Sequence, residues 1–296
     1  MKRIVLASGG LDSSTLLTIL PKEDMLGVDL VIPDVTYLIK NRERIRGMLQ
    51  QCGYRIADSE ENADVIVINT CGFIESAKQE AIDNILDEAW LKENRSLKGI
   101  IVTGCLAERY REQILEEMPE VDALLGVGSI HNIVEAIKAV EKQAKRKNVP
   151  ASEKYCSFED KNTVRLGGDR VLTTPDYAAY LKIAEGCDNR CTYCAIPSIR
   201  GKFRSRPMED VVAEAKDMDA LGIKELTLVA QDTTRYGTDW SGEHKLAELL
   251  RELCKLDFHW IRLHYLYPDQ MDECSQYACL FYVTGTCTTR TTAEGN

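Results

Sequence analysis

Between residues 64 and 143, short apolar runs alternate with longer stretches in which apolar residues recur at helical spacing. The short runs predict buried strands, and the longer stretches predict helices that pack on them. The expected strands are DVIVIN (64–69), GIIVTG (99–104) and VDALLG (121–126). The expected helices cover residues 73–90, 106–118 and 129–143, with Ser129 capping the third. This alternation predicts a small doubly wound α/β domain with a parallel sheet.

The first of these helices is expected to bury one face and expose the other. Its apolar residues recur three and four positions apart, with charged residues between them. The expected core face is Ile74, Ala77, Ala81, Ile82, Ile85, Leu86 and Ala89.

A second series of strands and helices follows a segment without a sustained period. Residues 144–177 start near a basic KRK run and are interrupted by Gly167, Gly168 and Pro175, which indicates a linker. Beyond it, the expected strands are YLKIAEG, KELTLVAQ and HWIRLHYLY, and the expected helices are MEDVVAEAKDMDALG and HKLAELLRELCKL. Such a series predicts the beginning of a TIM-like (β/α) barrel, truncated because a complete barrel takes about 250 residues.

The chain is therefore expected to have five parts. They are an atypical start (1–33), the doubly wound domain (34–143), the linker (144–177), the partial barrel (178–273) and an unmatched tail (274–296).

Composition narrows the class of function. The 296 residues are 44% hydrophobic and carry a formal net charge of −10, which argues against a broad basic surface for nucleic acid. A smaller basic patch remains an alternative, and its residues would be Arg200, Lys202, Arg204 and Arg206. No apolar run approaches the ~20 residues that span a bilayer, and the start lacks a secretion signal. We therefore expect a cytoplasmic protein without a membrane partner.

In that reducing compartment, eleven cysteines favour metal ligands or spare thiols over disulfides.

Three of these cysteines lie close together in a loop that directly follows an expected strand. Cys187, Cys191 and Cys194 have the spacing C-x-x-x-C-x-x-C. Zinc usually takes four ligands, commonly from paired cysteines, and no second pair follows at short distance. Three thiolates instead leave one iron of a cubane open to a small molecule. Against incidental cysteines or a zinc site, we favour a 4Fe-4S cluster.

Two further cysteines follow neighbouring expected strands. Cys71 comes two residues after DVIVIN, and Cys105 comes directly after GIIVTG. Parallel strands bring residues at their carboxyl ends to the same end of the sheet. A lone cysteine there is commonly an apolar filler, but two at equivalent positions favour a shared metal site.

With these residues in view, the chain resembles the radical-SAM methylthiotransferase family. The segments that carry the resemblance cover most of residues 47–270. They are ADVIVINTCGFIESAKQEAID, VTGCLAERY, YLKIAEGCDNRCTYCAIPSIRGKFRSRPMEDVVAEA, LTLVAQDTTRYG and WIRLHYLYP. YLKIAEGC and AQDTTRYG resemble the branch that modifies an aspartate of ribosomal protein S-twelve, and the acidic net charge agrees with a protein substrate. The branch that modifies adenosine in tRNA is the alternative.

The resemblance implies two 4Fe-4S clusters, S-adenosylmethionine (SAM) and an electron donor. Cys187, Cys191 and Cys194 would hold the SAM-binding cluster, with Tyr193 beside SAM, whereas Cys71 and Cys105 would hold an auxiliary cluster. One SAM would methylate sulfur, and a second would yield the radical that activates the β-carbon of the aspartate. Asp232, Arg235 and Tyr236 also match family positions, without an assigned step.

The sequence departs from the family in two places besides its shortened barrel. The third auxiliary ligand would fall near Val35, where there is no cysteine, and the nearby Cys52 is expected in the core. The start, SGGLDSS (8–14), resembles the phosphate loop of ATP pyrophosphatases of the 7-cyano-7-deazaguanine synthase type, because glycines before a helix can wrap a phosphate. A PP-loop ATP-dependent ligase and an inactive chimeric fragment are therefore further alternatives.

Overall fold

The structure is a computed structural model that describes residues 3–9, 43–57, 60, 63–144, 146, 149–164 and 166–267. The chain forms two compact units. The first consists of Met1–Thr173 with Asn189–Gly201, and the second of Thr174–Asp188 with Lys202–Asn296.

The first unit is built on a sheet of six parallel strands in the order β2-β1-β3-β4-β5-β6. Its strands are β1 (Arg3–Gly9), β2 (Arg55–Ile56), β3 (Val65–Thr70), β4 (Gly99–Gly104), β5 (Ala123–Leu125) and β6 (Tyr155–Ser157). Every residue of β3, β4 and β5 is buried, as expected for central strands covered on both faces. The three strands predicted here are confirmed.

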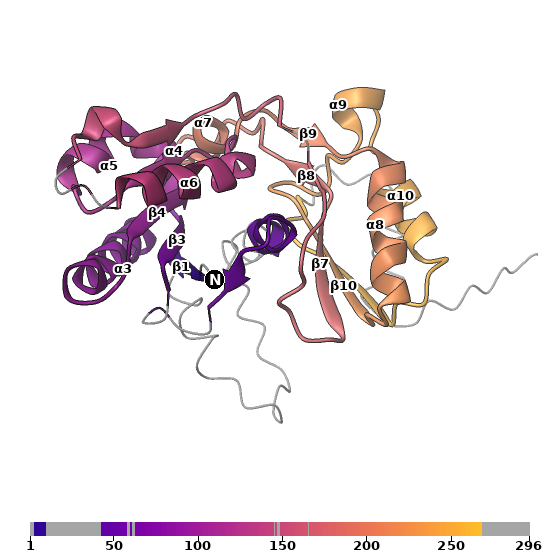
Figure 1. Cartoon of the computed structure of the whole chain (residues 1–296). Helices are drawn as coiled ribbons and strands as arrows, with labels where there is room; N and C mark the ends of the chain where they lie inside the picture. The colour runs from indigo at the N-terminus through magenta and orange to yellow at the C-terminus, as the bar shows by residue number, and fades with distance from the viewer. Residues whose placement is uncertain are drawn as a thin grey trace, which may run out of the picture. The chain divides into compact units, whose positions relative to one another are not determined.

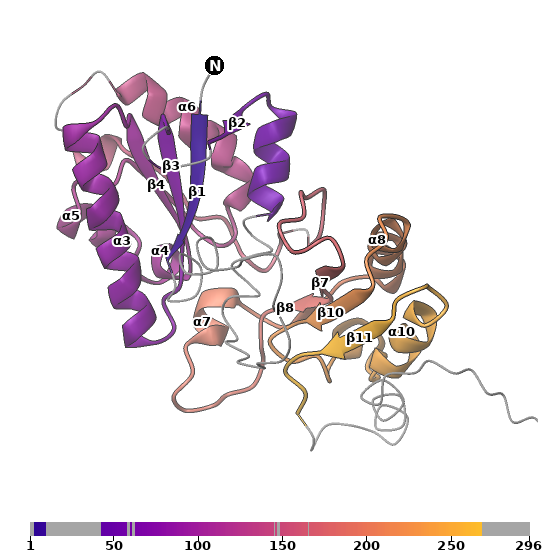
Figure 2. The same cartoon turned by 90° about the horizontal axis from the view of Figure 1, so that it is seen from below.

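Helices cover both faces of this sheet (Figure 2). One face packs against α3 (Glu75–Asn94), α4 (Cys105–Tyr110) and α5 (Glu112–Glu117), in a core that includes Ile66, Ile68, Ile100 and Val102. The other face packs against α6 (Ile133–Gln143) and the helical residues 43–51, in a core that includes Val65, Val67 and Ile101. Alternate side chains of β3 and β4 thus enter opposite cores, and the predicted doubly wound α/β arrangement is confirmed.

The helices differ in detail from the prediction. Ile74, directly before α3, and Leu86 within α3 are exposed, whereas Glu88 is buried between the expected core residues. The helix expected over 106–118 is divided into α4 and α5 at Arg111, which has a φ of 43°. Ser129 does not cap a helix, because a 3₁₀ turn (Ile130–Asn132) precedes α6 and the Ser129 hydroxyl accepts a hydrogen bond from the Glu159 N–H, at 2.8 Å.

Both ends of the predicted domain carry additional strands. The segment expected to be a linker contains β6, which pairs with β5, and a 3₁₀ turn at Ala151–Glu153. At the start of the chain, β1 pairs with β3 over six residues and with β2 on its other side. β1 includes Ser8 and Gly9 of the predicted phosphate loop, and Gly10–Ser14 lie outside the described residues.

The second unit contains a parallel sheet of three strands in the order β11-β10-β7. Figure 1 labels β7 and β10, and Figure 2 labels all three strands. The strands are β7 (Ala178–Lys182), β10 (Glu225–Val229) and β11 (Trp260–Leu263), and α8 (Met208–Ala220) and α10 (Leu246–Leu253) connect them in sequence. A short antiparallel pair, β8 (Ala184–Glu185) with β9 (Arg204–Ser205), and the helical turn α9 (Thr238–Ser241) complete the unit. The order of strands and helices agrees with the predicted beginning of a (β/α) barrel.

No helix within the described ranges combines the length and the apolar character needed to cross a bilayer.

Candidate metal centre

Cys71 and Cys105 follow the carboxyl ends of adjacent parallel strands. In the register of β3 with β4, Thr70 lies opposite Gly104, so each cysteine directly follows a paired residue. Both side chains are buried, at 2% and 1% exposure. The predicted placement of the two cysteines at the same end of the sheet is thus confirmed.

The backbone at this end of the sheet is packed so closely that glycine is required. Gly104 has a φ of 97°, and a Cβ there would lie 2.4 Å from the carbonyl oxygen of Thr70. At Gly72, a Cβ would lie 2.9 Å from the backbone nitrogen of Leu106. The glycines beside Cys71 and Cys105 therefore allow the two cysteine segments to approach each other.

The described residues do not complete a set of three thiols here. Cys52 is exposed, contrary to the expectation that it lies in the core, and it comes three residues before β2. Arg55 of β2 lies opposite Arg3, at the amino end of β1. Because a strand rises roughly 3.3 Å per residue, the six paired residues of β1 and β3 separate Cys52 from Cys71 by about 20 Å.

Cys156 does not supply the missing thiol either. It is an exposed residue of β6, two strands away from β4, and neighbouring strands lie about 4.8 Å apart. Within the described ranges, the two thiols therefore do not fit an auxiliary cluster held by three cysteines.

An arginine contacts one of these cysteines. The Nη2 of Arg200 donates a hydrogen bond to the Sγ of Cys105, at 3.0 Å, and both side chains are buried. Nearby, the Nη1 of Arg109 donates to the carbonyl oxygen of Gly72, at 2.8 Å. The sulfur of Cys105 thus lies beside the positively charged guanidinium of Arg200.

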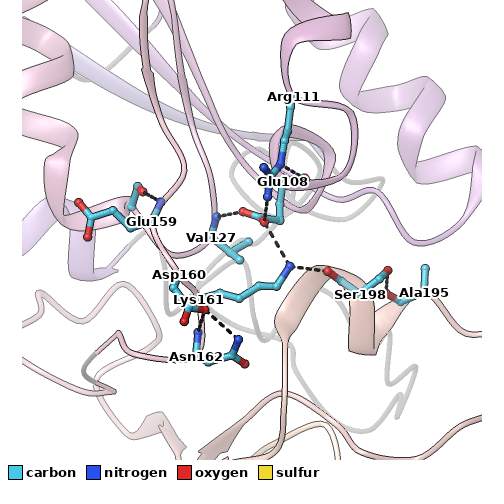
Figure 3. A network of polar contacts seen from close by, with 10 residues as sticks. Glu108, Arg111, Val127, Glu159, Asp160, Lys161, Asn162, Ala195 and Ser198 are labelled. Carbon is cyan, nitrogen blue, oxygen red and sulfur yellow. Dashed lines mark hydrogen bonds and ion pairs between the residues drawn. The ribbon is translucent and has the colours of Figure 1, made fainter.

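Glu108, in the helix that follows Cys105, is the centre of a polar network (Figure 3). Its buried carboxylate accepts hydrogen bonds from the Nη2 of Arg111 at 3.0 Å, the N–H of Val127 at 3.1 Å and the Nζ of Lys161 at 3.2 Å. Lys161 also donates to the carbonyl oxygen of Ser198. Glu108 is therefore a buried charge that is both paired and hydrogen-bonded, the condition under which such groups are tolerated.

The loop with the predicted cluster begins in the second unit. Cys187 follows β8 and Gly186, whose φ of 79° suits glycine, and its side chain is 6% exposed. The Oδ1 of Asp188 accepts a hydrogen bond from the N–H of Phe203, at 3.1 Å, which fixes the chain directly after Cys187.

Cys191 and Cys194 belong to the first unit. The N–H of Cys194 donates to the carbonyl oxygen of Cys191, at 3.1 Å, which closes a tight turn directly before α7 (Ile196–Arg200). Both cysteines are partly exposed, and Tyr193 between them is 91% exposed.

The three loop cysteines fit an iron-sulfur cluster in the number and type of their donors. None of the eight cysteines that the structure describes is disulfide-bonded. In the same part of the chain, no three His, Cys, Asp or Glu side chains are grouped so that they could hold a metal ion. A cluster at Cys187, Cys191 and Cys194, and a role of Tyr193 beside SAM, stay predictions.

Buried polar side chains gather after β10 and β8 in the second unit. The Nε2 of Gln231 donates to the Oε1 of Glu185 at 3.1 Å, and Lys182 forms an ion pair with Glu185. Asp232 is fully buried and accepts a hydrogen bond from the Thr234 hydroxyl. Gln231 and Asp232 follow β10 at its carboxyl end, where barrel enzymes place their chemistry, and Lys182 and Glu185 are the last residues of β7 and β8.

The buried side chain of Tyr236 holds the backbone of a neighbouring segment in place. Its hydroxyl donates to the carbonyl oxygen of Arg206 at 2.9 Å, and burial raises the pKa of the phenol above its ordinary value.

The buried contacts of Arg200, Arg206, Glu108 and Lys161 were not predicted from the sequence. Arg200 and Arg206 are buried, so the four residues of the suggested basic patch do not form an exposed patch. Arg206 forms an ion pair with Glu214, at 2.6 Å. Glu108 and Lys161 gave no signal beyond being charged residues in a helix and in an expected linker.

Two segments of the chain match known protein families. Residues 39–126 match the family described as "Uncharacterized protein family UPF0004", and residues 181–284 match the radical SAM superfamily. The second match includes Cys187, Cys191 and Cys194.

Curated relatives match across both segments. The chain is 49% identical over 233 residues to "Ribosomal protein uS12 methylthiotransferase RimO" of Desulforamulus reducens, which is 78% of this chain and 51% of the relative. It is 49% identical over 234 residues to the protein of the same name in Clostridioides difficile, which is 78% of this chain and 50% of the relative. The chain thus spans about half the length of the curated relatives that it matches.

A solved structure shares the fold. The radical S-adenosylmethionine methyltransferase TsrM from Kitasatospora setae, solved with cobalamin and a [4Fe-4S] cluster, matches with a TM-score of 0.56 at 13% identity, over 94% of this chain and 58% of TsrM. At that identity the match supports the α/β fold alone. Two successive segments of the chain thus match the UPF0004 family and the radical SAM superfamily, and the resemblance to the radical-SAM methylthiotransferases is confirmed.

Proposed function

We propose that this chain is a radical-SAM methylthiotransferase that adds a methylthio group to the β-carbon of an aspartate in ribosomal protein S-twelve. One observation carries the proposal: the 49% identity over 233 residues to proteins named as methylthiotransferases of that ribosomal protein. The net charge of −10 agrees with a protein substrate, because it disfavours binding to an extended nucleic-acid backbone.

In this proposal, Cys187, Cys191 and Cys194 would hold a 4Fe-4S cluster beside the SAM site. When bound, such a cluster would supply the electron for reductive cleavage of SAM, and a separate donor would provide that electron. The protein contributes the three thiolates, the turn at Gly186 and the tight turn from Cys191 to Cys194.

Glu185, the last residue of β8, and the polar residues after β10 are proposed to orient the reactants. Glu185 is held by Gln231 and Lys182, so its carboxylate has a fixed position. Asp232 is held by Thr234 in the same way. Preorganised groups of this kind bind a polar ligand with little reorganisation.

In the proposed reaction, a separate sulfide supplies the sulfur of the methylthio group, and a first SAM methylates it. The resemblance implies an auxiliary cluster with three cysteine ligands, but the described residues provide Cys71 and Cys105 alone at the carboxyl end of the sheet. No step is therefore assigned to such a cluster.

Anaerobic reconstitution with iron and sulfide, followed by an assay for deoxyadenosine, tests the proposal. We expect about four irons per chain and reductant-dependent cleavage of SAM. Cys191→Ala should abolish the cleavage, whereas Cys156→Ala, which removes an exposed thiol in β6, should leave it unchanged. Mass spectrometry of a peptide with the target aspartate then detects the methylthio product. Equal deoxyadenosine production by Cys191→Ala and the unmodified chain would refute the proposed cluster.

A further inference from the structure

We propose that Lys161 is a positioning residue for the cysteine loop, because it fastens the helix that follows Cys194 to the helix that follows Cys105. This inference rests on the proposed function, since it assumes a cluster at Cys187, Cys191 and Cys194. All residues that carry it belong to the first unit.

The helix α7 is too short to fix its own position. It has five residues, and isolated helices shorter than about 12 residues are marginal in water. Within the segment, the Ile199 N–H donates to the Ala195 carbonyl and the Gly201 N–H to the Pro197 carbonyl, both at 3.1 Å. Its placement must therefore come from contacts with other elements.

Lys161 supplies one such contact (Figure 3). Its ammonium donates to the carbonyl oxygen of Ser198 in α7 and, at 3.2 Å, to the carboxylate of Glu108 in α4. Glu108 is itself fixed by Arg111 and by the N–H of Val127. A single side chain thus connects α7 to a rigid, buried anion.

The loop around Lys161 is also held in place. The Oδ1 of Asp160 accepts hydrogen bonds from the N–H and Nδ2 of Asn162, at 2.9 and 2.8 Å, so a local turn flanks the lysine. Asn162 in turn lies against Gly201, where a Cβ would be 2.4 Å from its Oδ1. The segment 160–162 therefore contacts α7 at Ser198 and also contacts Gly201, the residue directly after α7.

A second connection joins α7 to Cys105, the first residue of α4. Arg200, the last residue of α7, donates to the Sγ of Cys105 at 3.0 Å. Lys161 and Arg200 thus both connect α7 to α4, and the turn with Cys191 and Cys194 lies directly before α7. The alternative is that the buried side chain of Ile199 alone holds α7 by apolar packing.

The test compares Lys161→Gln, which removes the ammonium, with Lys161→Arg, which keeps a cationic donor. Lys138→Gln is the matched control, because Lys138 is an exposed lysine on α6. All variants carry Cys71→Ala, so that bound iron reports on the loop cysteines. Hydrogen exchange of residues 196–201 is measured on the protein without iron, and the rate of iron loss to a ferrous chelator is measured after anaerobic reconstitution.

We expect Lys161→Gln to raise the exchange rate of the α7 amides by about tenfold and to speed iron loss, with exchange in α3 and α6 unchanged. Lys161→Arg should restore both readouts. Unchanged exchange in α7 would overturn the inference, and so would faster exchange with unchanged iron loss, because α7 would then be mobile without consequence for the cysteines. Absence of bound iron in the Cys71→Ala parent would overturn it as well.

Failure of the proposed function is distinguishable from these outcomes. A chain that binds iron but cleaves no SAM would contradict the methylthiotransferase proposal, whereas the exchange and iron-loss measurements would still decide the role of Lys161.

Discussion

The guanidinium of Arg200 donates a hydrogen bond to the sulfur of Cys105 across 95 residues of sequence. The contact connects the segment after the cysteine loop to the carboxyl end of β4. Since both side chains are buried, the charge of Arg200 has little water to replace a lost partner.

Replacing Cys105 should therefore destabilise the folded protein even when no metal is bound. We expect Cys105→Ala to lower the free energy of unfolding by about 2 to 3 kcal/mol, because it removes a buried acceptor from a charged donor. Cys105→Ser retains an acceptor and should cost less. Urea unfolding of the metal-free protein measures both, and Cys156→Ala is the control with an exposed thiol. Equal stability of Cys105→Ala and the parent would contradict the contact.

Glu88 should make stability depend on pH in an unusual direction. Burial, followed by the nearby charges of Glu60 and Asp87, raises the pKa of this carboxyl from 4.5 to about 7. Between pH 4.5 and pH 7 the folded state therefore binds more protons than the unfolded state, and this group's contribution to stability falls as pH rises.

Glu88→Gln should remove that loss and stabilise the protein by about 1 to 2 kcal/mol at pH 8, with little effect near pH 4.5. Urea unfolding at several pH values provides the measurement. Glu93→Gln, at an exposed position of the same helix, should leave the free energy of unfolding unchanged at both pH values. A Glu88→Gln variant that is less stable at pH 8 would show that the carboxylate is favoured in the folded state.

Gly104 should be more sensitive to substitution than Gly53. Both have positive φ values, 97° and 78°, but a Cβ at Gly104 would lie 2.4 Å from a backbone oxygen, whereas a Cβ at Gly53 meets nothing within 4 Å. Gly53→Ala should cost about 1 kcal/mol, from backbone strain alone. Gly104→Ala should cost several times more, because the β3 and β4 ends must move apart. Thermal unfolding compares the two, and equal shifts would argue against the close packing.

Tyr236 should contribute stability through its hydroxyl. Tyr236→Phe should destabilise the protein by about 1 to 2 kcal/mol, because the carbonyl of Arg206 loses its donor in a buried position. Burial raises the pKa of this phenol, so the number of tyrosines that ionise near pH 10 should be the same in the variant and the parent. One fewer ionising tyrosine in the variant would contradict the burial of Tyr236.

The strands could be predicted from sequence because their signal is local. β3 contains the apolar run VIVI and β4 contains the run IIV, and an apolar run bounded by polar residues predicts a buried strand without knowledge of its neighbours. The shared position of Cys71 and Cys105 followed from the same signal, because it depends only on where two parallel strands end.

The polar contacts could not be predicted because their partners are distant in sequence. Lys161 and Glu108 are 53 residues apart, and nothing near either of them indicates burial. Ser129 matched a helix cap, yet its hydroxyl accepts from Glu159. β6 was missed because its three residues, only partly buried or exposed, have no apolar run. These features are determined by tertiary contacts, which override local preference.

The place of β1 within the sheet has a practical consequence for anyone who expresses this protein. β1 lies between β2 and β3, so deleting its seven residues would strip β3 of a partner and leave an open edge prone to aggregation. An affinity tag fused ahead of Arg3 would instead emerge at the amino end of the strands, about 20 Å from Cys71 and Cys105. A tag in that position would lie at the opposite end of the sheet from Cys71 and Cys105.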